Sequence, residues 1–282
     1  MSIPSELAHG QSRRRMVVGI VASCLLAAVL WGVAALPVLH VVGLTLFMGL
    51  LPALAVAQVP LAREMKLPRL QVYASSAATL TGLAVVSLTL SVLAGGPDLG
   101  FRRLSPAALT TWTLGLVLAG LVMTLAFKVL SSPLGLEEGP ILRALLPRTA
   151  SERRAFGGLS VAAGLGEEMA YRGYVLGLLV PLLGTGGAVV VSSAVFGVLH
   201  AYQGVLGLAR TATAGALMAG GFILSGSLWP PVLAHILFDV LVGLVLADYL
   251  VPPASDEDGL ATERDTDADS GVAPDSPAEE RL

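Results

Sequence analysis

Two adjacent glutamates and an arginine interrupt a long apolar region in the segment GLGEEMAYRG, residues 164–173. A carboxylate inside a bilayer is costly, so such residues usually pair with one another or carry out chemistry. On a helix, Glu168 and Arg172 are four residues apart and share a face, which favours an ion pair. Glu167 is five residues from Arg172 and points away from it. We therefore predict that Glu168 and Arg172 support the structure, whereas Glu167 is available as a general base.

Two further patterns place a histidine one helical turn from a second residue. FGVLH joins Phe196 and His200, and HILFD joins His235 and Asp239. An aspartate at this spacing can hold a histidine ring in one tautomer through its ring N–H. A histidine in a membrane can also serve only to hydrogen-bond one helix to another. His40, beside Pro37 at a span junction, is expected at the membrane interface.

Glu167, His200, His235 and Asp239 fall on three separate apolar segments and together could activate a water molecule. Glu167, His200 and His235 could also ligate a divalent ion such as zinc, which makes a bound water a better nucleophile. The sequence contains no HExxH, GxSxG or SxxK pattern. The residues alone therefore indicate a buried acid–imidazole site that is either hydrolytic or proton-relaying. A shared site requires His200 and His235 to lie within about 10 Å of each other. The predicted spans place the two histidines at different depths in the membrane. A shared site therefore predicts that the SGSLWPP turn before His235 dips into the membrane and brings His235 towards the other groups.

The elements that must position these residues are membrane-spanning helices. The chain is 55% hydrophobic and 13% charged, whereas soluble domains carry roughly 25% charged residues. Its uncharged runs exceed the roughly 20 residues that cross a bilayer as a helix. We therefore predict an all-α, polytopic membrane protein with about eight transmembrane helices, at residues 16–36, 41–60, 72–94, 107–127, 155–181, 187–207, 211–225 and 229–249.

Charge divides the chain into five regions. We expect a cytoplasmic N-terminal segment (1–15), a four-helix membrane region (16–130), a basic cytoplasmic loop (131–154), a catalytic membrane region (155–250) and an acidic disordered tail (251–282). Lys and Arg in short loops favour the cytoplasmic side, so both termini are predicted to be cytoplasmic. Ten of the twenty acids lie in the tail, which has no aromatic residue and cannot form a core.

Composition also limits the partners. Cys24 is the only cysteine, which excludes an intramolecular disulfide, and we expect it to pack as a small apolar residue. Nucleic-acid binding has no support, because the sequence has no aromatic-basic patch. The Ala, Gly, Leu and Arg content is typical of a GC-rich bacterium, which suggests a bacterial cytoplasmic membrane.

The three patterns, in this order, resemble the CPBP family of intramembrane proteases, which includes CAAX prenyl proteases and bacteriocin-processing or immunity proteins. The family pattern is EExxxR, then FxxxH, then HxxxN or HxxxD. It reads here as EEMAYR (167–172), FGVLH (196–200) and HILFD (235–239). The resemblance covers about residues 155–245.

The resemblance implies an eight-helix fold and hydrolysis of a peptide bond in a membrane-embedded or lipid-anchored protein or peptide. Glu167 would be the base for a water shared with His200, and His235 and Asp239 would assist at the oxyanion or a metal. Glu168, Arg172 and Phe196 would support the site. CAAX proteases commonly have Asn at position 239. Because an ionised Asp239 can only accept hydrogen bonds, it is better suited to orient His235, to ligate a metal or to act as a protonated acid.

Two other functions fit the same residues. The fold and motifs could belong to a non-catalytic membrane scaffold or bacteriocin-immunity protein, in which the polar groups only hold helices together. A proton-coupled transporter could use Glu167 and Asp239 as relay acids. The Glu167→Gln variant separates the hydrolase from the scaffold, because it removes the base and keeps the size of the side chain.

Overall fold

The computed structural model describes residues 5–62, 68–135 and 140–246, which are helical and contain no strand. The predicted acidic tail therefore lies outside the described residues. The first half comprises α1 (Ser5–Gly32), α2 (Val38–Thr45), the π-helical turn η1 (Leu46–Leu50), α3 (Leu51–Ala62), α4 (Arg69–Leu93), α5 (Pro106–Ser131) and η2 (Ser132–Leu134). The second comprises α6 (Pro140–Ala144), α7 (Ala150–Glu167), the π-helical segment η3 (Glu168–Val175), α8 (Leu176–Leu199), η4 (Ala201–Gln203), α9 (Gly204–Ser225) and α10 (Trp229–Leu244).

The all-helical membrane architecture is confirmed. Six segments among the described residues are long and apolar enough to cross a membrane, and the shorter α10 is also apolar. One of the six runs from Ala150 to Leu199 and is broken at Gly184, whose backbone is not helical (φ 68°, ψ 167°). A positive φ of this kind favours glycine because it has no Cβ. Counted with this break, the segments agree with the predicted number of about eight.

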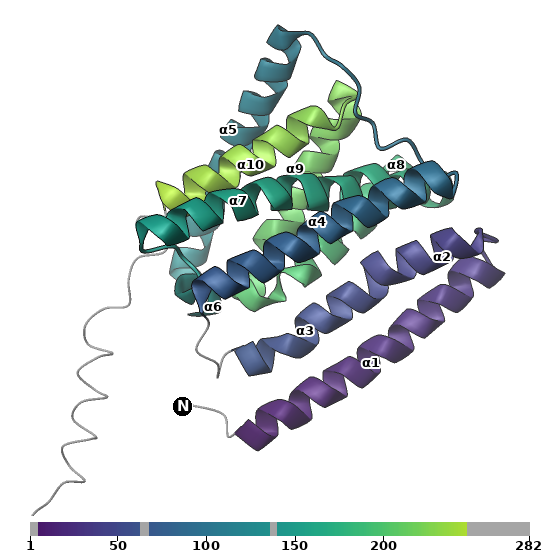
Figure 1. The fold of residues 1–282 in the computed structure, drawn as a ribbon, viewed down its shortest axis with the longest axis horizontal. Coiled ribbons are helices and arrows are strands. Elements are labelled where there is room, and N and C mark those ends of the chain that lie inside the picture. Colours follow the sequence, from purple (N-terminus) through teal and green to yellow (C-terminus); the bar gives the residue numbers. More distant parts are fainter. Residues whose placement is uncertain (1–4, 63–67, 136–139, 247–282) are drawn as a thin grey trace, which may run out of the picture.

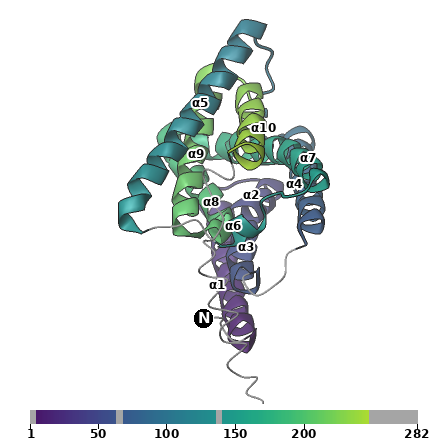
Figure 2. The ribbon, with the colours of Figure 1, turned by 90° about the vertical axis from the view of Figure 1, so that its left-hand side faces the viewer.

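Two groups of helices pack together (Figure 1). The helix α1 runs beside α2 and α3. In the second group, α7 lies between α4 and α10, while α8 packs on α9 and α5 crosses α9 and α10 (Figure 2). The α1–α3 group meets the second group through contacts of α3 with α8 and η4. The helices that carry the predicted site, namely α7, α8 and α10, therefore belong to one packed group.

The centre of the fold is η3, in which every residue is buried. Tyr171 donates a hydrogen bond to the Phe47 carbonyl in η1 (2.7 Å), so the two π-helical segments are joined. The Tyr174 hydroxyl is 2.9 Å from Nδ1 of His40. His40 is only 4% exposed, so this side chain is buried in the protein, and its position at the membrane interface stays a prediction. A buried tyrosine hydroxyl supplies the polar partner that we had expected from the interface.

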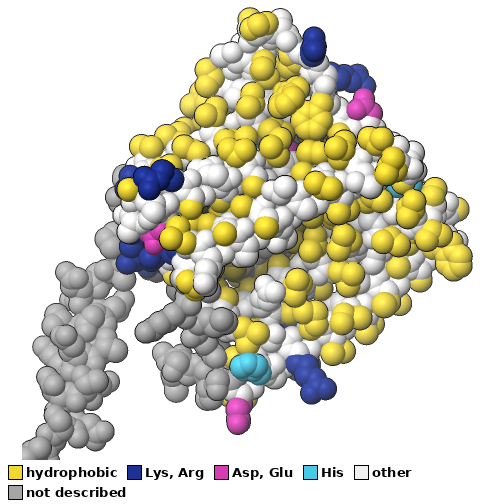
Figure 3. Space-filling view, in the orientation of Figure 1, with side chains coloured by type: hydrophobic (Ala, Val, Ile, Leu, Met, Phe, Trp, Pro, Cys, Tyr) yellow, Lys and Arg dark blue, Asp and Glu magenta, His cyan; other side chains and the backbone are white. Residues whose placement is uncertain are grey.

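The outer surface is rich in apolar side chains, and charged ones lie at its margins (Figure 3). Large contiguous apolar surfaces are rare on soluble monomers and are expected where helices face lipid. Cys24 is among the exposed residues of α1, so the expectation that it packs inside the protein is wrong.

Three basic segments lie at one end of the molecule. Arg15 of α1 donates to the carbonyl of Val56 near the end of α3 (3.3 Å). Arg69 at the start of α4 donates to the Ala144 carbonyl (2.8 Å) and lies 3.6 Å from Glu152 of α7. The starts of α4 and α7 are thus neighbours in space, and the basic part of α1 lies beside the end of α3.

Candidate active site

The segment that opened the sequence analysis changes helix type within its pair of glutamates. The helix α7 ends at Glu167, and Glu168 begins the π-helical segment η3. π-helical turns are rare and occur frequently at functional sites. The predicted pair of Glu168 and Arg172 is present, with 2.9 Å between Oε1 and Nη1.

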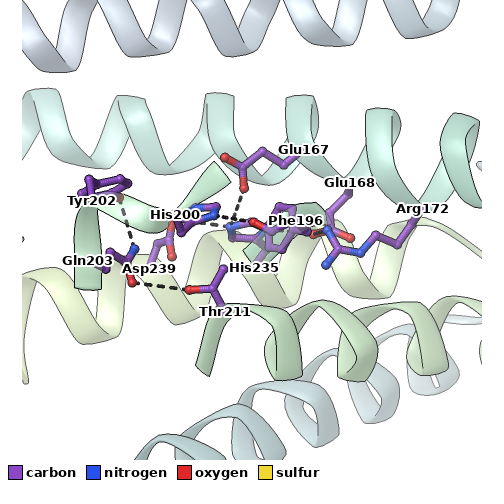
Figure 4. Close-up of polar contacts among 10 residues, drawn as sticks. All are labelled: Glu167, Glu168, Arg172, Phe196, His200, Tyr202, Gln203, Thr211, His235 and Asp239. Atoms are coloured by element: carbon purple, nitrogen blue, oxygen red, sulfur yellow. Dashed lines mark hydrogen bonds and ion pairs between the residues drawn. The ribbon is translucent and has the colours of Figure 1, made fainter. Parts of the chain in front are cut away.

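Glu168 has a second partner that the sequence did not reveal. Its Oε1 lies 2.8 Å from Nδ1 of His235 on α10 (Figure 4). A carboxylate oxygen can only accept, so Nδ1 of His235 is the donor. Glu168 is fully buried, and its Oε1 accepts from both Arg172 and His235. It therefore links η3 to α10 and fixes the orientation of the His235 ring.

The other ring nitrogen of His235 faces two carboxylates. Nε2 is 3.7 Å from Oε2 of Glu167 and 3.7 Å from Oδ2 of Asp239. These distances exceed that of a direct hydrogen bond. His235 and Glu167 are each 14% exposed and Asp239 is 31% exposed, so a small molecule can reach them. Glu167, His235 and Asp239 therefore form an accessible group, and Glu168 is the buried residue on the other side of the His235 ring.

His200 joins this group from the end of α8. The helix stops at Leu199, and the His200 backbone has already left the helical region (φ −97°, ψ 19°). Its Nδ1 lies 2.9 Å from the Phe196 carbonyl and must donate to it. This assigns the Nε2 of a neutral His200 as a hydrogen-bond acceptor. His200 also lies near Asp239 (Figure 4).

Phe196 holds the buried layer together. The Arg172 guanidinium lies over its ring, 4.3 Å from the centroid, in an arrangement that attracts a cation to an aromatic face. The rings of Tyr171 and His200 contact it at centroid distances of 5.4 and 4.9 Å. Phe196 therefore connects the ion pair of η3 to His200.

Comparison with known families gives one match within this region. Residues 151–241 match the family described as type II CAAX prenyl endopeptidase Rce1-like. This part of the chain is similar to the Rce1-like family. The match confirms the resemblance seen in the three motifs and points to a peptidase. Neither the curated proteins nor the solved structures contain a significant match to the chain.

The geometry of the Rce1-like region differs from the sequence expectation at two places. We expected Asp239 to orient His235, but Glu168 makes that hydrogen bond and Asp239 faces the opposite nitrogen. We also expected a span at 187–207, whereas the helix ends at Leu199 and a new one begins at Gly204. Gly204 has a positive φ of 85°, which allows the sharp turn. His200 is therefore at a helix end and not inside a helix.

Tyr202 and Gln203, which belong to none of the three motifs, lie beside the site in Figure 4. The ring of Tyr202 is 6.0 Å from that of His200, and its amide neighbour Gln203 is buried. The signal that could have found them is HAYQG, which is a tyrosine, an amide and a glycine placed directly after a predicted catalytic histidine.

The metal prediction can be compared with the donor positions. In the part of the chain that the structure describes, no group of three or more His, Cys, Asp or Glu side chains is gathered closely enough to hold an ion. The Nδ1 atoms of both histidines are already bonded within the protein. This leaves the Nε2 atoms facing the site, as in a histidine that ligates a metal through one nitrogen. An ion at Glu167, His200 and His235 therefore stays a prediction, and we route no step of the reaction through one.

Proposed function

We propose that the chain is an intramembrane endopeptidase that hydrolyses a peptide bond with water activated by Glu167. The observation that carries the proposal is the accessible group of Glu167, His235 and Asp239 on apolar helices, with both carboxylates 3.7 Å from one histidine nitrogen. Two carboxylates and an imidazole that converge on one point can bind and deprotonate water. The Rce1-like match over residues 151–241 supports a peptidase.

In the proposed reaction Glu167 takes a proton from a water molecule while the water oxygen attacks the scissile carbonyl. His200 accepts a hydrogen bond from the second hydrogen of that water through Nε2, and this hydrogen stays on the attacking oxygen. The oxyanion of the tetrahedral intermediate accepts a hydrogen bond from Nε2–H of a protonated His235, whose ring is held by Glu168. Glu167 then gives its proton to the departing amine. Each proton that leaves the water is thereby accounted for.

Asp239 has a different part in this scheme. An ionised carboxylate cannot donate to an oxyanion, and Oδ2 of Asp239 faces Nε2 of His235. We assign Asp239 to positioning: it favours the proton on Nε2 before substrate arrives.

The substrate class follows from the setting of the site. We propose a membrane-embedded or lipid-anchored protein or peptide, and the family description makes a prenylated protein with a C-terminal CAAX sequence the first to test. We also propose that the end of the molecule with Arg15 and Arg69 faces the cytoplasm, as expected for short basic segments. The N-terminus would then be cytoplasmic.

Substrate trapping in native membranes tests this function. We expect the Glu167→Gln variant to retain a bound protein that wild-type chain cleaves, and the peptides released in wild-type membranes to be missing from the variant. Identical peptide profiles for the two proteins would count against a protease. Proton or solute flux through liposomes that is lost in Glu167→Gln would favour the transporter instead.

A further inference from the structure

The turn between α8 and α9 presents a second polar cluster beside the site. It contains Tyr202 and Gln203 of η4 and two residues from the next helix, Arg210 and Thr211. The turn follows His200 directly. The reaction proposed above does not use these side chains.

Hydrogen bonds fix the orientation of the Gln203 amide. Its Oε1 accepts from Nη2 of Arg210 (3.1 Å) and from Oγ1 of Thr211 (3.4 Å). Because the oxygen is bound to α9, the amide nitrogen must face the other way, where it lies 3.2 Å from the Tyr202 hydroxyl (Figure 4). The side chain is 8% exposed. A Cβ at Gly207 would overlap it, so it fits closely against α9.

This orientation determines what the tyrosine hydroxyl can do. An amide N–H₂ can only donate, so the oxygen of Tyr202 accepts from Gln203 and its own hydrogen is directed elsewhere. The ring of Tyr202 lies 6.0 Å from that of His200, and the side chain is partly exposed. Glu167 and Asp239 both act on Tyr202 electrostatically. The hydroxyl is therefore a hydrogen-bond donor at the edge of the reacting group.

We propose that Tyr202 is a further catalytic residue, whose hydroxyl donates a hydrogen bond to the carbonyl oxygen of the scissile bond as negative charge develops there. Asp239 cannot make this donation because an ionised carboxylate only accepts. Tyr202 keeps its proton throughout, and no covalent bond changes at it. Gln203 is a positioning residue that acts through the tyrosine. This proposal rests on the proposed peptidase function.

Steady-state kinetics in liposomes test the role of Tyr202, with the protein captured by Glu167→Gln as substrate. Loss of one oxyanion donor costs about 10²–10³ in kcat, so we expect Tyr202→Phe to lower kcat by that factor with KM nearly unchanged. The control is Tyr73→Phe, which removes a buried hydroxyl that donates to the Leu145 carbonyl far from the site. We expect wild-type kcat for the control.

A second variant tests the direction of the hydroxyl without removing it. In Gln203→Glu the new carboxylate accepts from Tyr202 and still pairs with Arg210, so it draws the hydroxyl hydrogen away from the substrate. We expect a fall in kcat similar to that of Tyr202→Phe, with thermal unfolding close to wild type. This outcome separates a catalytic donor from a residue needed only for folding.

The possible failures are distinct. An active wild type together with an unimpaired Tyr202→Phe, or with a change in KM alone, would overturn the proposal for Tyr202 and leave the peptidase in place. If Glu167→Gln captures no protein and releases the same peptides as wild type, the peptidase function fails, and the proposal for Tyr202 fails with it.

Discussion

Glu167 and Glu168 are neighbours in the chain, but their surroundings differ. Glu168 is fully buried and bonded to Arg172 and His235, whereas Glu167 is 14% exposed and faces Nε2 of His235. Removing one partner of a buried ion pair leaves an uncompensated charge. Substitution of Glu168 should therefore lower stability, whereas substitution of Glu167 should lower activity.

We predict that Glu168→Gln lowers the free energy of unfolding by about 3 kcal/mol, because Arg172 is left buried without its counter-charge. Thermal unfolding in detergent measures the effect. Glu167→Gln is the matched control and should unfold close to the wild-type temperature. A Glu168→Gln variant as stable as wild type would show that the buried pair contributes little.

A prediction about metal follows from the donor geometry. Because no three donor side chains are gathered in the described residues, we expect purified protein to keep its peptidase activity after dialysis against a chelator. Activity that is lost on chelation and restored by zinc would instead support an ion held by Glu167, His200 and His235. Metal analysis of the dialysed protein serves as the control.

Part of this site could be read from the sequence, and part could not. The four-residue spacing of Glu168 and Arg172 predicts their pair because a helix brings such residues together. The bond between Glu168 and His235 joins residues 67 positions apart, and it depends on how α10 crosses η3. Spacing within one helix carries no information about that crossing. The four-residue spacing of His235 and Asp239 therefore predicts that Asp239 orients the His235 ring, whereas Glu168 makes that hydrogen bond.

At the scale of elements, two glycines let α7 approach its neighbours just before Glu167. A Cβ at Gly164 would lie 2.9 Å from the Val232 carbonyl oxygen of α10, and one at Gly166 would lie 2.9 Å from the carbonyl carbon of Leu80 in α4. Small residues of this kind let membrane helices pack backbone to backbone. The position of Glu167 therefore depends on close contacts on two sides of α7.

We predict that Gly166→Ala lowers stability by about 1–3 kcal/mol and reduces peptidase activity, because the obstructing atoms belong to the backbone of α4 and α7 must move. Gly158→Ala is a matched control in the same helix, where an added Cβ meets no atom within 4 Å. It should retain full activity and gain up to about 1 kcal/mol from helix propensity. The two variants are compared by thermal unfolding and by turnover of substrate. Equal stability and equal turnover would contradict the close contact of α7 with α4 at Gly166.

The helices themselves were largely predictable, but their ends were not. Long uncharged runs give the spans because only apolar helices cross a bilayer. The end of α8 at Leu199 has no charged or proline residue that marks it, and apolar residues resume directly after the HAYQG turn. The π-helical form of η3 is likewise set by its partners, including the Phe47 carbonyl that binds Tyr171.

For the whole molecule, the grouping of basic segments predicts an orientation. With Cys24 replaced by Ser, we expect a cysteine introduced by Arg103→Cys to react with a membrane-impermeant maleimide in intact cells. One introduced by Ser151→Cys should react only after permeabilisation. Both positions are exposed, and they lie on opposite ends of the predicted spans. The reverse pattern would show that the basic end faces outward.

The claim that Glu167 activates the hydrolytic water is tested most directly by product formation in liposomes. Wild type and Glu167→Gln would be compared on the captured substrate by mass spectrometry, with thermal unfolding measured on the same samples. We predict that wild type cleaves one peptide bond and that Glu167→Gln, equally folded, is at least about 100-fold slower, as expected for loss of a general base. Equal cleavage rates in the two folded proteins would contradict the claim.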